Sequence, residues 1–179
     1  MSIGPNRLFQ TIKRFSLALG ELENSGIHVK LGEDFLEYRH YRASQTDRGP
    51  CYPMFDIQSS FIDHTNGFWI CGFDPDGDLI HTQAVRLLDL RGVSLFEHLN
   101  THRHKYITPD STPDPDKTSF TGPRALKTIT GSVAYHGDFW LRAKGLAGPR
   151  SQGATAVLSR LLLEVAALTW NPSYLFALV

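Results

Sequence analysis

The last part of the chain, from Thr128 to Val179, constrains the fold most strongly. It starts with an extended segment, ITGSVAYHGDFWL, and continues through a Gly, Pro and basic loop, RAKGLAGPRSQG, into a long helix and a short final strand. Apolar residues recur along the helix at spacings of three and four, at Leu158, Leu161, Leu162, Val165 and Leu168. This spacing predicts a helix with one face turned into a core.

The loop before this helix has the features of an anion site. It brings to the helix start Arg150, Ser151, Gln152, Gly153 and Ala154. The first backbone N–H groups of a helix have no intrahelical partner, and the helix dipole turns its positive end toward them. A glycine there lets the backbone approach a ligand, and an arginine adds charge. The sequence therefore predicts a seat for an anion or a pyrophosphate.

Composition limits the class of protein. A chain of 179 residues with 41% hydrophobic content can bury one good core, so we expect a single domain. Eighteen basic residues balance eighteen acidic ones, which disfavours nucleic-acid and anionic-membrane partners. Cys51 and Cys71 have neither disulfide-framework nor zinc-site spacing, and no apolar run approaches a membrane span of about 18 residues. We expect a soluble, cytoplasmic protein.

The N-terminal segment predicts a helix from Pro5 to a stop at Asn24, Ser25 and Gly26. Its apolar residues with helical spacing, expected to face the core, are Leu8, Ile12, Phe15, Leu19 and Leu22. Lys13 and Arg14 beside this stripe would also suit a partner-binding helix. An extended piece and a short element of undecided type follow, from Ile27 to Tyr41.

A Pro-rich connector and a β-hairpin come next. Tyr52, Met54 and Phe55 in the connector are expected to anchor it, or else to line an acceptor pocket. The runs FWICGF and LIHTQAVRLL, joined by DPDGD, predict a hairpin with a tight turn. The acidic linker lacks the continuation of a calcium loop, so we interpret it as the turn.

A short helix from Val93 to Asn100 is predicted after the hairpin. His98 and His102 are four residues apart and could share a metal ion, but their basic surroundings favour a solvated polar segment, and no metal site is expected. The segment from Thr108 to Gly122 is rich in Pro, Asp, Ser and Thr. Residues 105–125 are therefore expected to form a mobile loop, which could act as a lid.

This order of elements resembles the GNAT superfamily of acetyl-CoA-dependent N-acetyltransferases. The family signature runs from a strand into Arg/Gln-x-x-Gly-x-Gly/Ala at a helix start. Arg150 and Gly153 match it, whereas Thr155 stands where Gly or Ala is usual. The resemblance covers the chain from Phe68 onward. It implies an α+β fold for residues 1–179, with a mixed, mainly antiparallel sheet flanked by helices, of the acyl-CoA N-acyltransferase-like kind.

The resemblance also implies a coenzyme, acetyl-CoA or another acyl-CoA. Backbone amides of Ser151 to Thr155 would hold its pyrophosphate, together with Arg150. The exposed edge of a strand from Val133 to Leu141 would hydrogen-bond the pantetheine arm, as an added strand does. A final strand from Tyr174 to Val179 would splay away and leave a V-shaped gap for that arm.

The acetyl thioester would then lie near Tyr135, His136 and Asp138. An amine nucleophile must lose a proton, so His136 or Asp138 could act as the base, and Tyr135 could protonate the leaving thiolate. Side chains alternate along a strand, which predicts His136 and Asp138 on one face and Tyr135 on the other. A polar strand end without catalytic function is the alternative interpretation of YHGD.

The family pattern normally continues with another helix and two strands, whereas this sequence stops at Val179. We therefore expect a homodimer, a swapped element or a partner chain that covers the edge of the final apolar strand, or else a truncated or degenerate relative of the family. Three functions stay open. The first is acyl transfer to an unidentified small-molecule or peptide amine. The second is a non-catalytic relative that binds a CoA-type ligand or another protein. The third is an unrelated α+β domain in which Arg150 is a surface cation.

Overall fold

Five strands form one sheet in the order β1-β2-β3-β4-β5 in the computed structural model, which describes residues 4–45, 48–107, 114, 116–142 and 153–178. The strands are β1 (His28–Gly32), β2 (Gly67–Phe73), β3 (Leu79–Leu90), β4 (Gly131–Leu141) and β5 (Tyr174–Ala177). Strands β1 to β4 pair antiparallel, and β5 runs parallel to β4. The predicted α+β class, with a mixed and mainly antiparallel sheet flanked by helices, is confirmed.

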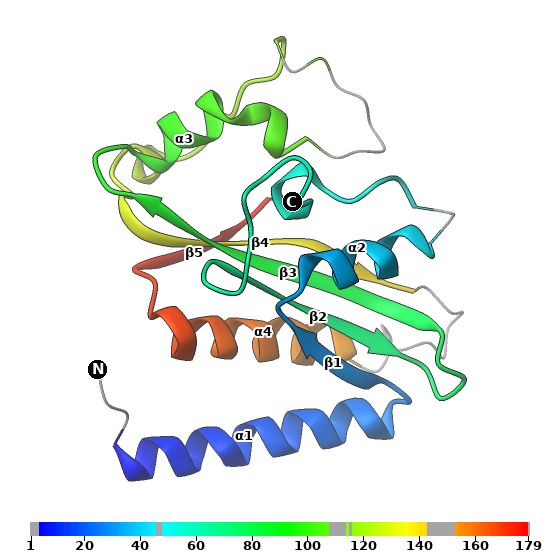
Figure 1. The fold of residues 1–179 in the computed structure, drawn as a ribbon. Helices are drawn as coiled ribbons and strands as arrows, with labels where there is room; N and C mark the ends of the chain where they lie inside the picture. The colour runs from blue at the N-terminus through cyan, green and yellow to red at the C-terminus, as the bar shows by residue number, and fades with distance from the viewer. Residues whose placement is uncertain (1–3, 46–47, 108–113, 115, 143–152, 179) are drawn as a thin grey trace.

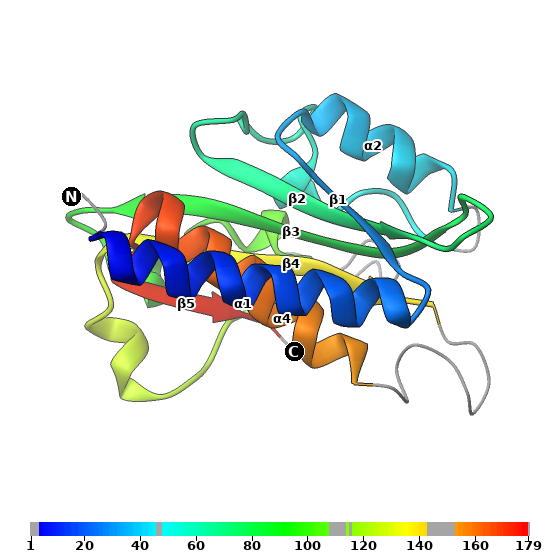
Figure 2. The same ribbon diagram turned by 90° about the horizontal axis from the view of Figure 1, so that it is seen from below.

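Helices cover both faces of this sheet. Helix α1 (Pro5–Asn24) and helix α4 (Ala154–Trp170) lie side by side under one face, and α2 (Phe35–Ala43) lies on the other (Figures 1 and 2). Helix α3 (Leu95–Thr101) follows β3, and three short 3-10 turns are η1 (Pro53–Phe55), η2 (Arg103–Lys105) and η3 (Arg124–Lys127). None of the helices in the described part of the chain combines the length and apolarity that a membrane crossing requires.

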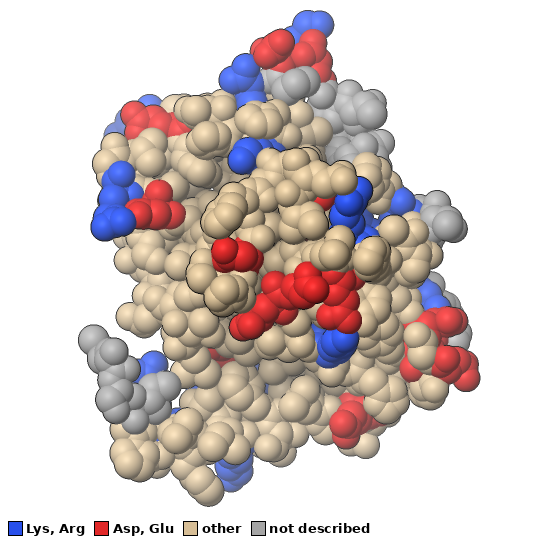
Figure 3. All heavy atoms as spheres, in the orientation of Figure 1, with Lys and Arg blue, Asp and Glu red and all other residues tan. Residues whose placement is uncertain are grey.

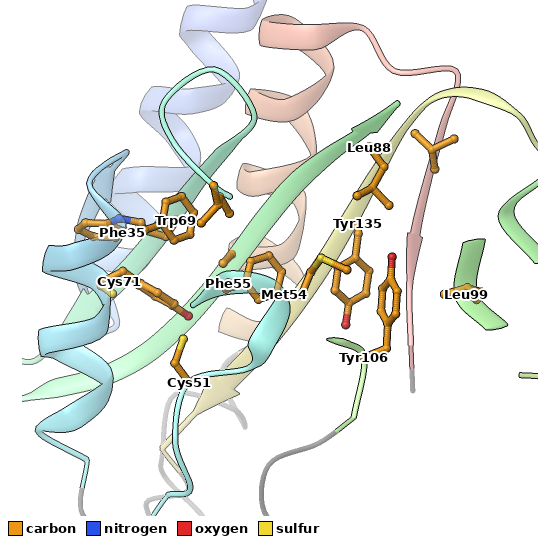
Figure 4. Close-up of a cluster of buried hydrophobic side chains, with 14 of the residues drawn as sticks. Phe35, Cys51, Met54, Phe55, Trp69, Cys71, Leu88, Leu99, Tyr106 and Tyr135 are labelled. Atoms are coloured by element: carbon orange, nitrogen blue, oxygen red, sulfur yellow. The ribbon is translucent and has the colours of Figure 1, made fainter. Parts of the chain in front are cut away.

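Two hydrophobic cores lie on opposite faces of the sheet. The α4 side contains Leu158, Leu161 and Leu162, all buried, which confirms the predicted apolar stripe of this helix. The α2 side is aromatic, and in Figure 4 Trp69, Phe55, Tyr135 and Tyr106 follow one another across the sheet. The second core therefore brings the connector into direct contact with the middle of β4, where Phe55 stacks on Tyr135.

The predicted hairpin is confirmed as β2 and β3. In its turn, the Gly77 amide donates to the Asp74 carbonyl at 2.9 Å, and the Asp78 amide donates to the Asp74 carboxylate at 2.9 Å. Gly77 has a φ of 87°, a conformation that disfavours side chains with a Cβ. The acidic linker is therefore a hydrogen-bonded turn.

The buried face of α1 differs from the predicted one. Leu22 is buried and Phe15 is half-buried, but Leu8 and Ile12 are 48% and 54% exposed, and Leu19 is exposed as well. The residues that face the protein are instead Thr11, Ala18 and Leu22. Thr11 and Ala18 have small side chains, so α1 can lie close to α4. The bulkier apolar residues of α1 therefore face outward.

Charged side chains of both signs lie on the face of the molecule that carries α2, with Asp and Glu gathered in a band near the centre of the view and Lys and Arg mostly around it (Figure 3). This distribution agrees with a formal net charge of zero. Association driven by a general electrostatic field is therefore not expected for this face.

Two buried histidines make stability depend on pH. Burial lowers the pKa of His81 to about 3 and that of His136 to about 4. Nδ1–H of His81 donates to the Trp140 carbonyl at 2.7 Å, and Nε2 has no partner among the described residues. Both imidazoles are therefore neutral in the folded protein, whereas they titrate near 6.5 in the unfolded chain.

We predict that the contribution of these two histidines to the free energy of unfolding reaches a plateau above pH 6.5. The free energy of unfolding should fall as the pH decreases from 6.5 toward 4. The unfolded chain binds more protons in this window, and each histidine contributes a slope of up to about 1.4 kcal/mol per pH unit. Urea unfolding at pH 7, 6 and 5 measures the slope. His81→Asn, which can keep the donor to Trp140, should reduce it; an equal slope in this variant would contradict the assignment.

Candidate functional site

Strand β4 contains a β-bulge that shapes the site. Ala84 pairs with Gly137 and Thr82 pairs with Trp140, so β4 has one residue more than β3 in this stretch. Asp138 lies in the bulge with a φ of 49°, in the left-handed region, which Asp and Asn tolerate better than most residues. The Thr82 hydroxyl donates to the Asp138 carbonyl at 3.0 Å. A bulge bends its strand and leaves a residue outside the ladder.

The carboxylate of Asp138 is completely buried and fully engaged. Its Oδ2 accepts from the Tyr38 hydroxyl at 2.6 Å and from Nε of Arg42 at 2.7 Å. Its Oδ1 accepts from Nη2 of Arg48 at 2.8 Å. Burial raises the pKa of the Asp138 carboxyl, and the two guanidinium groups and the Tyr38 hydroxyl act against that rise. This arrangement does not support Asp138 as a proton acceptor, because hydrogen bonds from Tyr38, Arg42 and Arg48 already engage both carboxylate oxygens.

The bulge also overturns the predicted facing of the catalytic candidates. The extra residue shifts the alternation, so Asp138 lies on the α2 side with Tyr135, while His136 lies on the α4 side. The expectation that His136 and Asp138 share a face is therefore wrong. The three residues remain close along the strand, but two lie above the sheet and one below it.

Strand β5 accompanies β4 for only part of its length. The pairing runs from Val133 opposite Tyr174 to His136 opposite Ala177. Beyond His136 the described residues place no strand on this side of β4. A pocket of about 460 Å³ lies at this point of divergence, and we call it the β4–β5 pocket. It is lined by Tyr52, Tyr106, Tyr135, His136, Gly137, Asp138, Phe139, Thr155, Ser159, Ala177 and Leu178.

The β4–β5 pocket reaches both faces of the sheet. His136, Thr155 and Ser159 line it on the α4 side, and three tyrosines line it on the α2 side. The space on the α2 side depends on Gly137. A Cβ at this position would lie 2.8 Å from the Tyr135 hydroxyl and 2.8 Å from Phe55. An elongated molecule could therefore pass between β4 and the end of β5.

Tyr135 is held rigidly at the α2 end of this pocket. Its ring stacks on Phe55 at 5.5 Å and meets Tyr106 and Phe176 edge-on or tilted at 5.0 Å. Figure 4 shows the Tyr135 and Tyr106 rings next to each other. Burial raises the pKa of Tyr135 above its ordinary range, so the phenol is protonated at neutral pH. It can donate a hydrogen bond to a developing negative charge.

Tyr106 is a pocket residue that the sequence did not reveal, because it begins the segment predicted to be a mobile loop. Its hydroxyl lies 2.8 Å from Nε2 of His98, and burial lowers the pKa of His98 to about 4. The neutral imidazole and the phenol therefore form a hydrogen bond between two uncharged groups. Phe120 also packs against Tyr106. Much of the remaining loop, residues 108–113 and 115, lies outside the described part of the chain.

The N-terminus of α4 opens onto the β4–β5 pocket. Gly153 precedes the helix with a φ of 78° and is exposed, and none of the described residues lies within 4 Å of a Cβ placed on it. Ala154 is buried, while Thr155 and Ser159, one turn apart, line the pocket. No side chain of the described residues caps this helix. Arg150, Ser151 and Gln152, predicted to bind the pyrophosphate, lie outside the described residues.

Two predicted coenzyme contacts on β4 are not supported. Val133 is paired with β5 and fully buried, so its edge is closed. Leu141 is buried against α4 and does not line the pocket. The open stretch of β4 is instead Gly137 to Phe139, because the bulge and the end of β5 coincide there.

Comparisons with known proteins give little further guidance. No protein-family model matches the chain, and no curated protein matches it. A solved structure, the crystal structure of a predicted acetyltransferase with acetyl-CoA from Clostridium acetobutylicum, is similar at a TM-score of 0.43. The two chains are 12% identical, over 86% of this chain and 80% of the other. A likeness this distant carries no conclusion about ligands, which must rest on the site itself.

We predict that Asp138→Asn destabilises the protein by about 3–5 kcal/mol, because it leaves two buried guanidinium groups without their anion. Asparagine has nearly the same shape as aspartate and also tolerates the left-handed conformation. The loss of stability therefore measures the effect of removing the negative charge. Urea unfolding is the measurement. Asp89→Asn, which breaks the exposed pair of Asp89 with Arg91, is the control and should change little. Equal effects of the two variants would contradict the assigned role of Asp138.

Proposed function

We propose that this protein is an acyl-CoA-dependent N-acyltransferase that transfers an acetyl group to an amine. The observation that carries the proposal is the β4–β5 pocket, which opens where β5 leaves β4 and connects the start of α4, where none of the described side chains forms a cap, with a buried tyrosine cluster. Acetyl-CoA has an anionic head, an extended amide-rich arm and a reactive thioester. In this order, these parts match the start of α4, the open edge of β4 and the tyrosine cluster.

In this proposal the diphosphate lies at the start of α4. Backbone amides around Gly153 and Ala154, the Thr155 hydroxyl and the neighbouring Arg150, Ser151 and Gln152 would bind it, because a helix start attracts anions. The pantetheine arm follows the edge of Gly137 to Phe139 that β5 leaves open, and it hydrogen-bonds there in the manner of an added strand. His136 lies beside the arm, on the α4 side.

The thioester then reaches the α2 side, beside Tyr135. The neutral amine attacks the thioester carbonyl and the C–S bond breaks. Tyr135 gives its proton to the leaving thiolate, and the nitrogen returns a proton to the phenolate, so the products are the amide and free CoA. Burial raises the pKa of Tyr135, so the phenol still carries its proton at neutral pH when the thiolate leaves. The amine would enter past Tyr52 and Tyr106.

Thr155→Glu tests the position of the diphosphate. We expect it to weaken acetyl-CoA binding about tenfold or more in calorimetric titration, because a carboxylate would repel the phosphates. The stability should not fall, since an acidic residue in the first turn of a helix is favourable. Ala156→Glu, on the same turn but away from the pocket, is the matched control. If the two variants bind acetyl-CoA with equal affinity, the placement of the diphosphate at the start of α4 is wrong.

Tyr135→Phe tests the chemistry. It should lower kcat about 100-fold and leave the KM for acetyl-CoA nearly unchanged, because it removes only the proton donor. Thiol release with an amine panel measures the rate. Tyr41→Phe, which removes a phenol bonded to Glu37 outside the pocket, should keep full activity. A Tyr135→Phe variant as active as the wild type would exclude the phenol from the reaction.

A second candidate function is binding of a CoA-type ligand without catalysis. It is favoured by the engagement of Asp138 and by the low pKa of His136, about 4, which makes the imidazole a weak base at neutral pH. Acetyl-CoA binding without thiol release for any amine would support this candidate. Both candidate functions include a cytoplasmic location. Both also include a homodimer or a partner that covers the outer edge of β5, where Tyr174 is exposed.

A further inference from the structure

A groove of about 420 Å³ lies at the start of α2, and we call it the α2 groove. Its walls come from the turn into α2 and from the loop before β2. It is lined by Glu33, Asp34, Phe35, Leu36, Ile57, Ile62, Asp63 and His64. None of these residues lines the β4–β5 pocket. The proposed acyl transfer therefore leaves the α2 groove without a function.

The α2 groove is acidic. Glu33, Asp34 and Asp63 line it, and its described lining residues include no Lys or Arg. None of the three carboxylates forms an ion pair with another described residue. In Figure 3, Asp and Glu side chains gather in a band where Figure 1 shows the start of α2. This local charge attracts cations and repels the phosphates of nucleic acids and acidic lipids.

Each of these carboxylates can still accept hydrogen bonds. Oδ1 of Asp34 accepts from the Leu36 amide at 2.8 Å and caps α2. Oδ1 of Asp63 accepts from the Thr65 hydroxyl at 2.6 Å and from the Thr65 amide at 2.9 Å, and these bonds lower the pKa of Asp63. Their Oδ2 atoms and the Glu33 carboxylate have no hydrogen-bond partner among the described residues. Ammonium and guanidinium donors suit these oxygens.

Apolar side chains form the floor and the border of the α2 groove. Phe35 and Ile62 are buried at the floor. Both pack tightly on Gly67, where a Cβ would lie 2.8 Å from Phe35 and 2.7 Å from Ile62. Leu36 and Ile57 are exposed at the border. The floor is therefore fixed, whereas the apolar border is in contact with water.

The loop before β2 presents apolar side chains on a held backbone. The Phe61 carbonyl accepts from the Arg86 guanidinium and from Nδ2 of Asn66. Oδ1 of Asn66 accepts from the Asp63 amide at 3.0 Å. The Phe61 side chain is nevertheless 78% exposed. Groups on a held backbone lose little conformational freedom when they bind a partner, so this loop is prepared for an apolar contact.

We propose that the α2 groove binds a basic segment of a partner protein, in which an apolar side chain lies between Lys or Arg residues. The basic side chains would meet the three carboxylates, and the apolar side chain would pack between Leu36 and Ile57, over Phe35. A metal ion or a polyamine would match the charge alone and would leave the apolar border in water. The peptide segment matches both features, and charge complementarity selects it over acidic partners. This partner is separate from the acyl acceptor.

Three immobilised libraries of short synthetic peptides test the proposal. In the first, an apolar residue lies between Lys and Arg residues; in the second, Asp and Glu replace Lys and Arg; in the third, Ser replaces the apolar residue. The protein should bind the best peptides of the first library at least about tenfold more tightly than their counterparts in the other two. Equal binding to matched peptides, or no binding to the first library, would overturn the proposal.

Variants assign the binding to the α2 groove. Glu33→Lys should weaken it about tenfold, because attraction becomes repulsion, and Leu36→Ala should weaken it about fivefold through lost apolar contact. Both side chains are exposed, so the fold should be kept. Glu23→Lys and Leu17→Ala, the same changes on exposed residues of α1, are the controls and should bind as the wild type does. Wild-type affinity in Glu33→Lys would overturn the assignment.

Light scattering distinguishes this partner from a second copy of the chain. The mass of the wild-type protein and that of Leu36→Ala should be the same, because the α2 groove binds a different protein. A wild-type dimer that Leu36→Ala separates into monomers would show that the α2 groove joins two copies, and would overturn the proposal.

Discussion

The buried carboxylate of Asp138 is the interaction on which the site depends. It joins three parts of the chain, because Tyr38 and Arg42 come from α2, Arg48 comes from the connector and Asp138 comes from β4. An ionised group buried this deeply is tolerated only with close partners of opposite charge. The left-handed conformation of Asp138 persists because these contacts and the Thr82 hydroxyl hold it from several directions.

The bulge at Asp138 links this ion-pair cluster to the pocket. It shifts the alternation of β4 at the place where β5 ends, so the edge of Gly137 to Phe139 is left open. Glycine at 137 keeps space beside the Tyr135 hydroxyl. The bulge therefore sets the facing of the side chains, and the end of the β5 pairing opens the strand edge beside it.

Burial gives the aromatic end of the pocket its chemical character. Tyr135 and Tyr106 lie among other rings in a hydrophobic core, and burial raises the pKa of both phenols. The imidazoles of His98 and His136 are neutral for the same reason. The β4–β5 pocket therefore offers neutral hydrogen-bond donors and acceptors from these side chains.

Local sequence patterns determined the secondary structure well. The spacing of Leu158, Leu161 and Leu162 predicted α4, and the β-rich runs around the DPDGD turn predicted β2 and β3. These features depend on neighbouring residues, so they can be recognised without a fold. The exposed stripe of α1 was not predictable in this way, because the face that a helix buries depends on the element it packs against, here α4.

The site itself was decided by tertiary structure. The sequence placed Tyr135 and His136 at the centre of the candidate site, and both line the β4–β5 pocket. It could not show that an extra residue in β4 would move Asp138 to the other face, since a bulge is defined by the partner strand. Nor could it show that Arg42 and Arg48, 96 and 90 residues away in the chain, would occupy the Asp138 carboxylate. Contacts between distant segments follow from packing, and no local spacing encodes them.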